Sequence, residues 1–210
     1  MKKTYNQFVS IVDRPLPTRV RWILLLLIVP LGTSFLFPLW RIRMEAPQYP
    51  RGIYIDIYGY KLDGGNDGRD VNEFNALNHY IGMEKLERSR IPELGWIPFA
   101  FGILALLTLR VAALGKLRDL VDLSVLTVYV TLFFFARYVL MLYQYGHNLA
   151  PTAALKVPPF MPVILGTKQI ANFTTQSYPL LGTVLAGTFA GGLVLATLWQ
   201  GLREWRKLEG

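Results

Sequence analysis

Four long apolar runs dominate the pattern of hydrophobic and polar residues along the chain. Each has about 19 residues or more, and at about 1.5 Å per residue a helix of that length crosses the ~30 Å hydrocarbon core of a bilayer. The pattern therefore predicts an all-α membrane protein. Its four transmembrane helices are expected at residues 22–40, 95–114, 120–145 and 180–202.

Basic residues beside these runs predict how the helices cross the membrane, because short cytoplasmic flanks are rich in Lys and Arg. Both predicted tails, 1–21 and 203–210, and the turn between the second and third helices carry such residues: Lys2, Lys3, Arg14, Arg19, Arg21, Lys116, Arg118, Arg203, Arg206 and Lys207. We expect both termini in the cytoplasm. The loops at 41–94 and 146–179 are then on the outer face.

The first outer loop reads as a small folded α+β region. Apolar and polar residues alternate through Ile53, Ile55 and Ile57, which is the period-two pattern of a strand. Turn residues follow at 63–68. Asp70 and Glu73 then resemble a capping box for a helix over residues 71–88.

The second outer loop, residues 146–179, is rich in proline and apolar residues. Pro158, Pro159 and Pro162 force an extended path that is not helical. We expect its apolar side chains to pack on the first loop or on the membrane surface.

Few charged residues interrupt the predicted spans, and the fourth span carries several glycines. Arg110 lies near the end of its helix, where its side chain can reach the headgroups. Arg137 lies deeper, so both snorkelling and pairing within the bundle remain open. Gly187 and Gly191 form a small-xxx-small pair, which predicts that another helix packs closely against the fourth span.

The composition narrows the possible chemistry. The chain has no cysteine, which excludes disulfides, iron–sulfur clusters and thiolate metal sites. No nucleophile motif, phosphate-binding loop or histidine pair within the spans is present, so we expect neither an enzyme nor a haem protein. The net charge of +8 is spread along the membrane flanks and does not indicate nucleic-acid binding.

His79 and Met83 are the candidate metal ligands of the first loop. They are four residues apart, which places them on one face of a continuous helix. Imidazole and thioether together suit copper, particularly Cu(I), and His147 in the second loop is the candidate third ligand. The alternative is that His79 makes a hydrogen bond and Met83 fills an apolar gap. Gly82 favours this alternative if it ends the helix.

Several local phrases carry a resemblance to a known family. They are Glu45-Ala46-Pro47-Gln48-Tyr49-Pro50-Arg51-Gly52, Leu77-Asn78-His79-Tyr80-Ile81-Gly82-Met83, Gly146-His147-Asn148-Leu149 and Pro158-Pro159-Phe160. With these phrases the chain resembles a poorly characterised family of bacterial multi-span membrane proteins found near genes for nitrous oxide reductase and related copper or cytochrome respiratory systems. The resemblance implies a bacterial cytoplasmic (inner) membrane location and a respiratory or copper-maturation context.

Two functions follow as expectations. The first is a non-catalytic accessory protein that handles copper, or aids maturation of a respiratory metalloenzyme, at the outer face. The second is a structural subunit of a membrane respiratory complex that contributes to a quinone site. Both imply membrane lipid and other membrane or periplasmic proteins as partners.

Overall fold

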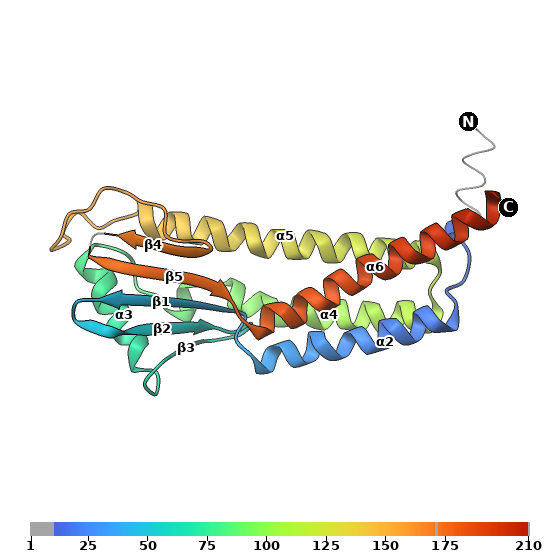
Figure 1. The fold of residues 1–210 in the computed structure, drawn as a ribbon, viewed down its shortest axis with the longest axis horizontal. Helices are drawn as coiled ribbons and strands as arrows, with labels where there is room; N and C mark the ends of the chain where they lie inside the picture. Colours follow the sequence, from blue (N-terminus) through green and yellow to red (C-terminus); the bar gives the residue numbers. More distant parts are fainter. Residues whose placement is uncertain (1–10, 171, 210) are drawn as a thin grey trace. The chain divides into compact units, whose positions relative to one another are not determined.

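The computed structural model describes residues 11–170 and 172–209. Lys2 and Lys3 of the predicted N-terminal tail, and Gly210, lie outside the described residues. The chain divides into two compact units (Figure 1). We call them the helical unit, formed by Met1–Thr33, Phe99–Leu132 and Leu185–Gly210, and the sheet unit, formed by Ser34–Pro98 and Phe133–Val184.

Four helices are long and apolar enough to cross a membrane, as the sequence predicts. They are α2 (Thr18–Thr33), α4 (Glu93–Leu114), α5 (Leu117–His147) and α6 (Leu181–Glu209). The 31 residues of α5 give a helix of about 46 Å, which is longer than the ~30 Å hydrocarbon core. One end of α5 therefore extends beyond that core. Helix α6 continues through most of the predicted 203–210 tail.

The first helix ends earlier than the predicted 22–40 span. Helix α2 stops at Thr33, a short 3-10 helix η1 (Ser34–Leu36) follows, and Trp40 already belongs to a strand. Pro38 disfavours helical geometry at Phe37, so the helical path stops at Leu36 and does not reach Trp40. Pro30 is accommodated inside α2.

Close helix contacts hold the helical unit together. A Cβ atom at Gly192 of α6 would lie 2.4 Å from Leu27 Cδ2 of α2, so a larger residue there requires the Leu27 side chain to move. Ser124 of α5 and Thr197 of α6 share a hydrogen bond of 2.6 Å. Small residues and hydroxyl bonds of this kind are what packs helices in lipid.

The sheet unit contains a five-stranded antiparallel sheet, so the all-α class is too narrow a description. Its order is β3-β2-β1-β5-β4, with β1 (Trp40–Ala46), β2 (Tyr49–Ile57), β3 (Leu62–Gly64), β4 (Gly166–Ile170) and β5 (Phe173–Pro179). The predicted strand at 53–57 lies within β2. The second loop, expected to follow an extended path that is not helical, contains β4 and β5, and β5 pairs directly with β1.

One face of the sheet is apolar because side chains alternate along each strand. Ile42 and Met44 of β1, Ile55 of β2 and Phe173 of β5 belong to one buried cluster with residues of α3 (Arg69–Tyr80). The neighbouring strand positions carry charge. Arg41 donates to both carboxylate oxygens of Asp56, at 2.6 and 2.7 Å.

Helix α3 begins differently from the prediction. Its N-cap is Gly68, in a left-handed conformation with φ of 84°, and the capping role expected of Asp70 is wrong. The buried Asp70 carboxylate instead accepts hydrogen bonds from Tyr54 N at 3.0 Å and Asn66 Nδ2 at 2.7 Å. Glu73 accepts a hydrogen bond from the Tyr49 hydroxyl. Asp70 and Glu73 therefore attach the N-terminal half of α3 to β2.

Candidate functional site

Helix α3 ends between His79 and Met83. Helix α3 ends at Tyr80, and Gly82 then adopts a left-handed conformation with φ of 82°. The i, i+4 relationship of a continuous helix therefore does not apply to this pair. His79 is exposed in the last turn of α3, whereas Met83 is half-buried against the apolar face of the sheet.

His147 is the last residue of α5. Its ring stacks on Tyr143, with centroids 3.8 Å apart, and Nδ1 donates to the Tyr143 carbonyl at 2.9 Å. Among the described residues, no group of three or more His, Asp or Glu side chains is arranged to hold a metal ion. Of the predicted set, Met83 lines a cavity of the sheet unit, whereas His79 and His147 are not among the residues that line it.

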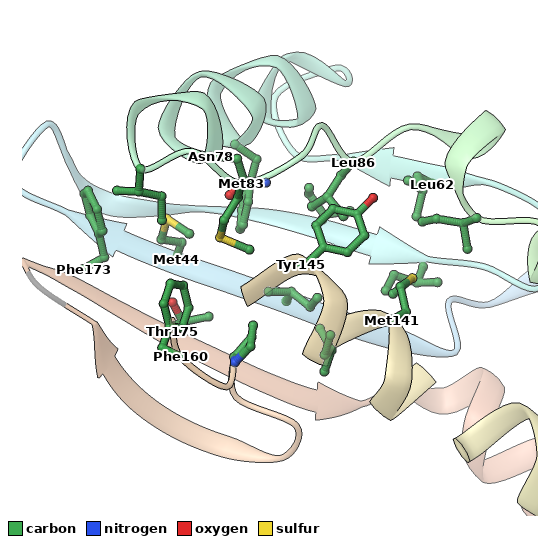
Figure 2. Close-up of a pocket in the computed structure, with 18 residues that line it drawn as sticks. Met44, Leu62, Asn78, Met83, Leu86, Met141, Tyr145, Phe160, Phe173 and Thr175 are labelled. Carbon is green, nitrogen blue, oxygen red and sulfur yellow. The ribbon is translucent and has the colours of Figure 1, made fainter. Parts of the chain in front are cut away.

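Met83 instead lines an apolar cavity of about 70 Å³ in the sheet unit (Figure 2). Two further methionines line it, Met44 from β1 and Met141 from α5. Most of the remaining wall is apolar, and includes Ile42, Ile55, Phe74, Ile81, Leu142, Phe160 and Phe173. The cavity thus lies between the apolar face of the sheet, α3 and α5.

Two glycines allow the loops to close around this cavity. At Gly82, a Cβ atom would lie 2.9 Å from the Ala150 carbonyl oxygen. At Gly146 of α5, it would lie 2.0 Å from the carbonyl oxygen of Phe160, whose amide donates to the Gly146 carbonyl at 3.0 Å. The second loop was expected to pack on the first loop or on the membrane surface. These residues of it pack on α5 and on the end of α3, which belongs to the first loop.

Asn78 is the unusual member of the cavity wall. Its side chain is buried, with 2% of the residue exposed, and the amide nitrogen Nδ2 has no hydrogen-bond partner. A buried donor without a partner costs about 1–3 kcal/mol. Such groups are rare in folded proteins and call for a specific explanation. The amide is therefore available to an acceptor that enters the cavity.

A second, polar cavity of about 110 Å³ lies against the other side of the same α5 residues. It is lined by Glu84, Arg90, Pro92, Glu93, Arg137, Met141, Gln144, Tyr145 and Asn148. Arg137 Nε donates to Glu93 Oε1 at 2.6 Å, and Arg90 pairs with Glu84 at 2.8 Å. Arg137 was expected either to snorkel to the headgroups or to pair within the bundle. In the structure it pairs with Glu93.

Met141 and Tyr145 line both cavities. They are one helical turn apart on α5, so the two cavities adjoin along this turn. The Tyr145 hydroxyl donates to the Lys85 carbonyl at 3.0 Å, which fixes the ring between them. The site thus has an apolar part with one unpaired donor and a polar part with two ion pairs.

Sequence reasoning found Met83 but not Asn78 or Met44. Asn78 had a usable signal, because it lies four residues after Phe74 and three before Ile81, on the apolar face of the helix. Met44 also had a usable signal, because Arg41, Ile42, Arg43 and Met44 alternate polar and apolar residues as a strand does.

No family model, no curated protein and no solved structure matches this chain. Its family is therefore not shown by comparison, and the functional argument rests on the geometry of the sheet unit.

Proposed function

We propose that this chain is a non-catalytic accessory protein of a bacterial cytoplasmic membrane, with the sheet unit on the outer face. The orientation is supported by the basic residues near the helix ends of the helical unit, among them Arg14, Lys116, Arg118 and Arg206. In the sheet unit, by contrast, basic and acidic residues occur together. Arg41, Arg90 and Arg137 each pair with a carboxylate there. Both termini are then cytoplasmic.

The function of the sheet unit, in this proposal, is to bind a small apolar molecule that carries a carbonyl or ether oxygen. The observation that carries it is the unpartnered Asn78 Nδ2 in a mostly apolar cavity. Binding of an acceptor oxygen there would satisfy a donor that otherwise remains buried and unpaired. Apolar contacts with Met44, Met83 and Phe74 supply the remaining attraction.

Quinones are the membrane-resident class that best fits this chemistry, because an apolar ring and tail carry exposed carbonyl oxygens. This ligand favours the role of a subunit or partner of a membrane respiratory complex. The cavity of about 70 Å³ is smaller than the ~150 Å³ apolar cavity that holds a benzene molecule, so it takes only part of such a ligand.

Copper handling is the second candidate, and a specific observation favours it. Met44, Met83 and Met141 come from three different elements and line one cavity. Thioether sulfur is a soft ligand that suits Cu(I). In this candidate the copper ligands are the three methionines. His79 and His147 are not ligands, because they do not line the cavity.

One pair of titrations distinguishes the candidates. The full chain in detergent is titrated with a decyl-substituted 1,4-benzoquinone by calorimetry, and the native protein is compared with Asn78→Leu. Loss of one hydrogen bond of about 1.4 kcal/mol lowers affinity about tenfold. His79→Ala is the matched control, because its side chain is exposed on the same helix.

The copper arm uses anaerobic Cu(I) titration against a competing chelator. Under the quinone proposal, Asn78→Leu weakens quinone binding and the triple variant Met44→Leu, Met83→Leu, Met141→Leu leaves Cu(I) affinity unchanged. Loss of tight Cu(I) binding in the triple variant, with quinone titrations flat in the native protein, would replace the first candidate by the second.

A further inference from the structure

The apolar cavity is too small to enclose a ring-bearing ligand by itself, and the polar cavity adjoins it. Their volumes are about 70 and 110 Å³, and Met141 and Tyr145 belong to both walls. A molecule that places its apolar part beside Met83 and extends past the side chains of Met141 and Tyr145 would reach the polar cavity with its other end.

The polar cavity has hydrogen-bonding groups that the fold leaves unused. Arg137 bonds to Glu93 through Nε, and its two terminal Nη nitrogens make no hydrogen bond to any residue that the structure describes. Gln144 and Asn148 are exposed residues of the cavity wall. The guanidinium is a donor and each side-chain amide is both a donor and an acceptor, so three donor groups face a ligand that carries oxygen atoms.

The charges of the polar cavity are already balanced. Arg137 pairs with Glu93 and Arg90 with Glu84, so the two arginines and two glutamates cancel. A charged ligand would therefore gain no net attraction from these paired side chains. An uncharged group rich in oxygen atoms can accept hydrogen bonds from Arg137, Gln144 and Asn148.

We infer that the polar cavity binds the oxygen-rich, uncharged head of the same ligand whose apolar part occupies the cavity beside Met83 and Asn78. This inference rests on the proposed function and adds the chemical class of the ligand. The ligand is amphipathic, with an apolar ring or chain and an uncharged head that carries several oxygen acceptors. Quinones with alkoxy groups and neutral glycerides share this chemistry.

Three probes test the inference on the full chain in detergent. The first, 2,3-dimethoxy-5-methyl-6-decyl-1,4-benzoquinone, has four oxygens. The second is the matched quinone with methyl groups in place of both methoxy groups. The third, monodecanoylglycerol, has an oxygen-rich head but no quinone ring. Each is titrated by calorimetry into the native protein, Asn78→Leu and the double variant Glu93→Gln, Arg137→Gln, which removes the ion pair without leaving an unpaired charge.

We expect the dimethoxy quinone to bind native protein at least fivefold more tightly than the dimethyl quinone. This advantage should disappear in the double variant, while Asn78→Leu weakens both quinones equally. Tightest binding by monodecanoylglycerol, with the same loss in the double variant, would support the inference and identify a glyceride as the source.

Two results would overturn the inference, and they differ in what else they imply. If both quinones bind equally and Asn78→Leu weakens them, the proposed function stands and the polar cavity plays no part in recognition. If none of the three probes binds the native protein, the proposed function and the inference both fail.

Discussion

Met83 N donates to the Asn78 carbonyl at 2.8 Å, and both side chains line the apolar cavity. Helix α3 ends at Tyr80 and the chain reverses at Gly82. The bond between Met83 and Asn78 therefore closes this reversal, where a longer helix would have continued. The reversal turns Met83 toward Met44 and Asn78 and leaves His79 exposed. The end of one helix therefore decides which residues form the site.

Gly82 is predicted to be essential for this reversal. Gly82→Ala combines an unfavourable positive φ with a Cβ atom 2.9 Å from the Ala150 carbonyl oxygen, and should lower stability by about 1–3 kcal/mol. Gly68→Ala is the matched control, since Gly68 also has a positive φ but no atom within 4 Å of the added carbon. Thermal unfolding of both variants measures the difference. Equal melting temperatures would mean that the approach of Ala150 does not constrain Gly82.

Gly187 and Gly191 are predicted to contact a partner helix. Both are exposed on α6, and a Cβ atom at either position meets nothing within 4 Å. Replacing both by leucine should preserve monomer stability but abolish complexes that survive in mild detergent. Gly192→Leu should do the opposite, because its Cβ atom would lie 2.4 Å from Leu27 Cδ2. Complexes unchanged in the double leucine variant would show that this face contacts only lipid.

The Tyr49 hydroxyl is predicted to make stability depend on alkaline pH. Its hydrogen bond to the Glu73 carboxylate raises the pKa of Tyr49 above its ordinary value of 10.0. Because the folded state holds this proton more tightly, the bond stabilises fully below that ordinary value and is lost as pH rises through the raised pKa. The melting temperature of native protein should exceed that of Tyr49→Phe at pH 7, and the gap should narrow above about pH 10. A constant gap up to pH 11 would contradict the assignment.

The Arg137–Glu93 pair is predicted to show non-additive energetics. The Glu93 side chain is only 16% exposed, so Arg137→Gln alone leaves a poorly solvated carboxylate unpaired and should cost about 1–3 kcal/mol. The double variant with Glu93→Gln should recover most of that loss. Thermal unfolding in detergent of the two single variants and the double variant forms a complete cycle. Additive losses would show that the two side chains do not depend on each other.

Topology is predicted by the basic flanks. Reporter fusions after residue 20, within residues 41–94, near Arg118 and after Gly210 should read inside, outside, inside and inside. A C-terminus on the outer face would require an odd number of spans and contradict the four-helix arrangement.

The membrane helices were predictable because length and apolar composition are local properties. The sheet was not, since β1 pairs with β5 across more than half of the chain, as in the pairing of Met44 with Thr175. The β5 residues Thr174, Thr175, Gln176 and Ser177 are polar, and a strand made of them has no apolar alternation to read. The three prolines at 158, 159 and 162 predicted an extended path but gave no strand pairing.

The candidate site was predicted only in part, for a related reason. The spacing of His79 and Met83 holds on a continuous helix, and Gly82 ends that helix. The burial of Asn78 depends on the sheet and on the second loop, which packs through Gly146 and Gly82. These contacts join residues that are far apart in the sequence, so the local pattern of any one segment does not predict them.

The most direct test of the account observes the Asn78 side chain itself. In full-length protein labelled with ¹⁵N-asparagine, the Asn78 amide signal is identified by its absence in Asn78→Leu, and the decyl-substituted dimethoxy benzoquinone is then added. The account predicts a saturable downfield shift of the Asn78 Nδ2 protons, while the Asn66 side-chain signal, already bonded to Asp70 at 2.7 Å, stays in place. An Asn78 signal that does not move, or moves only as much as that of Asn66, would contradict the claim that this amide binds the ligand.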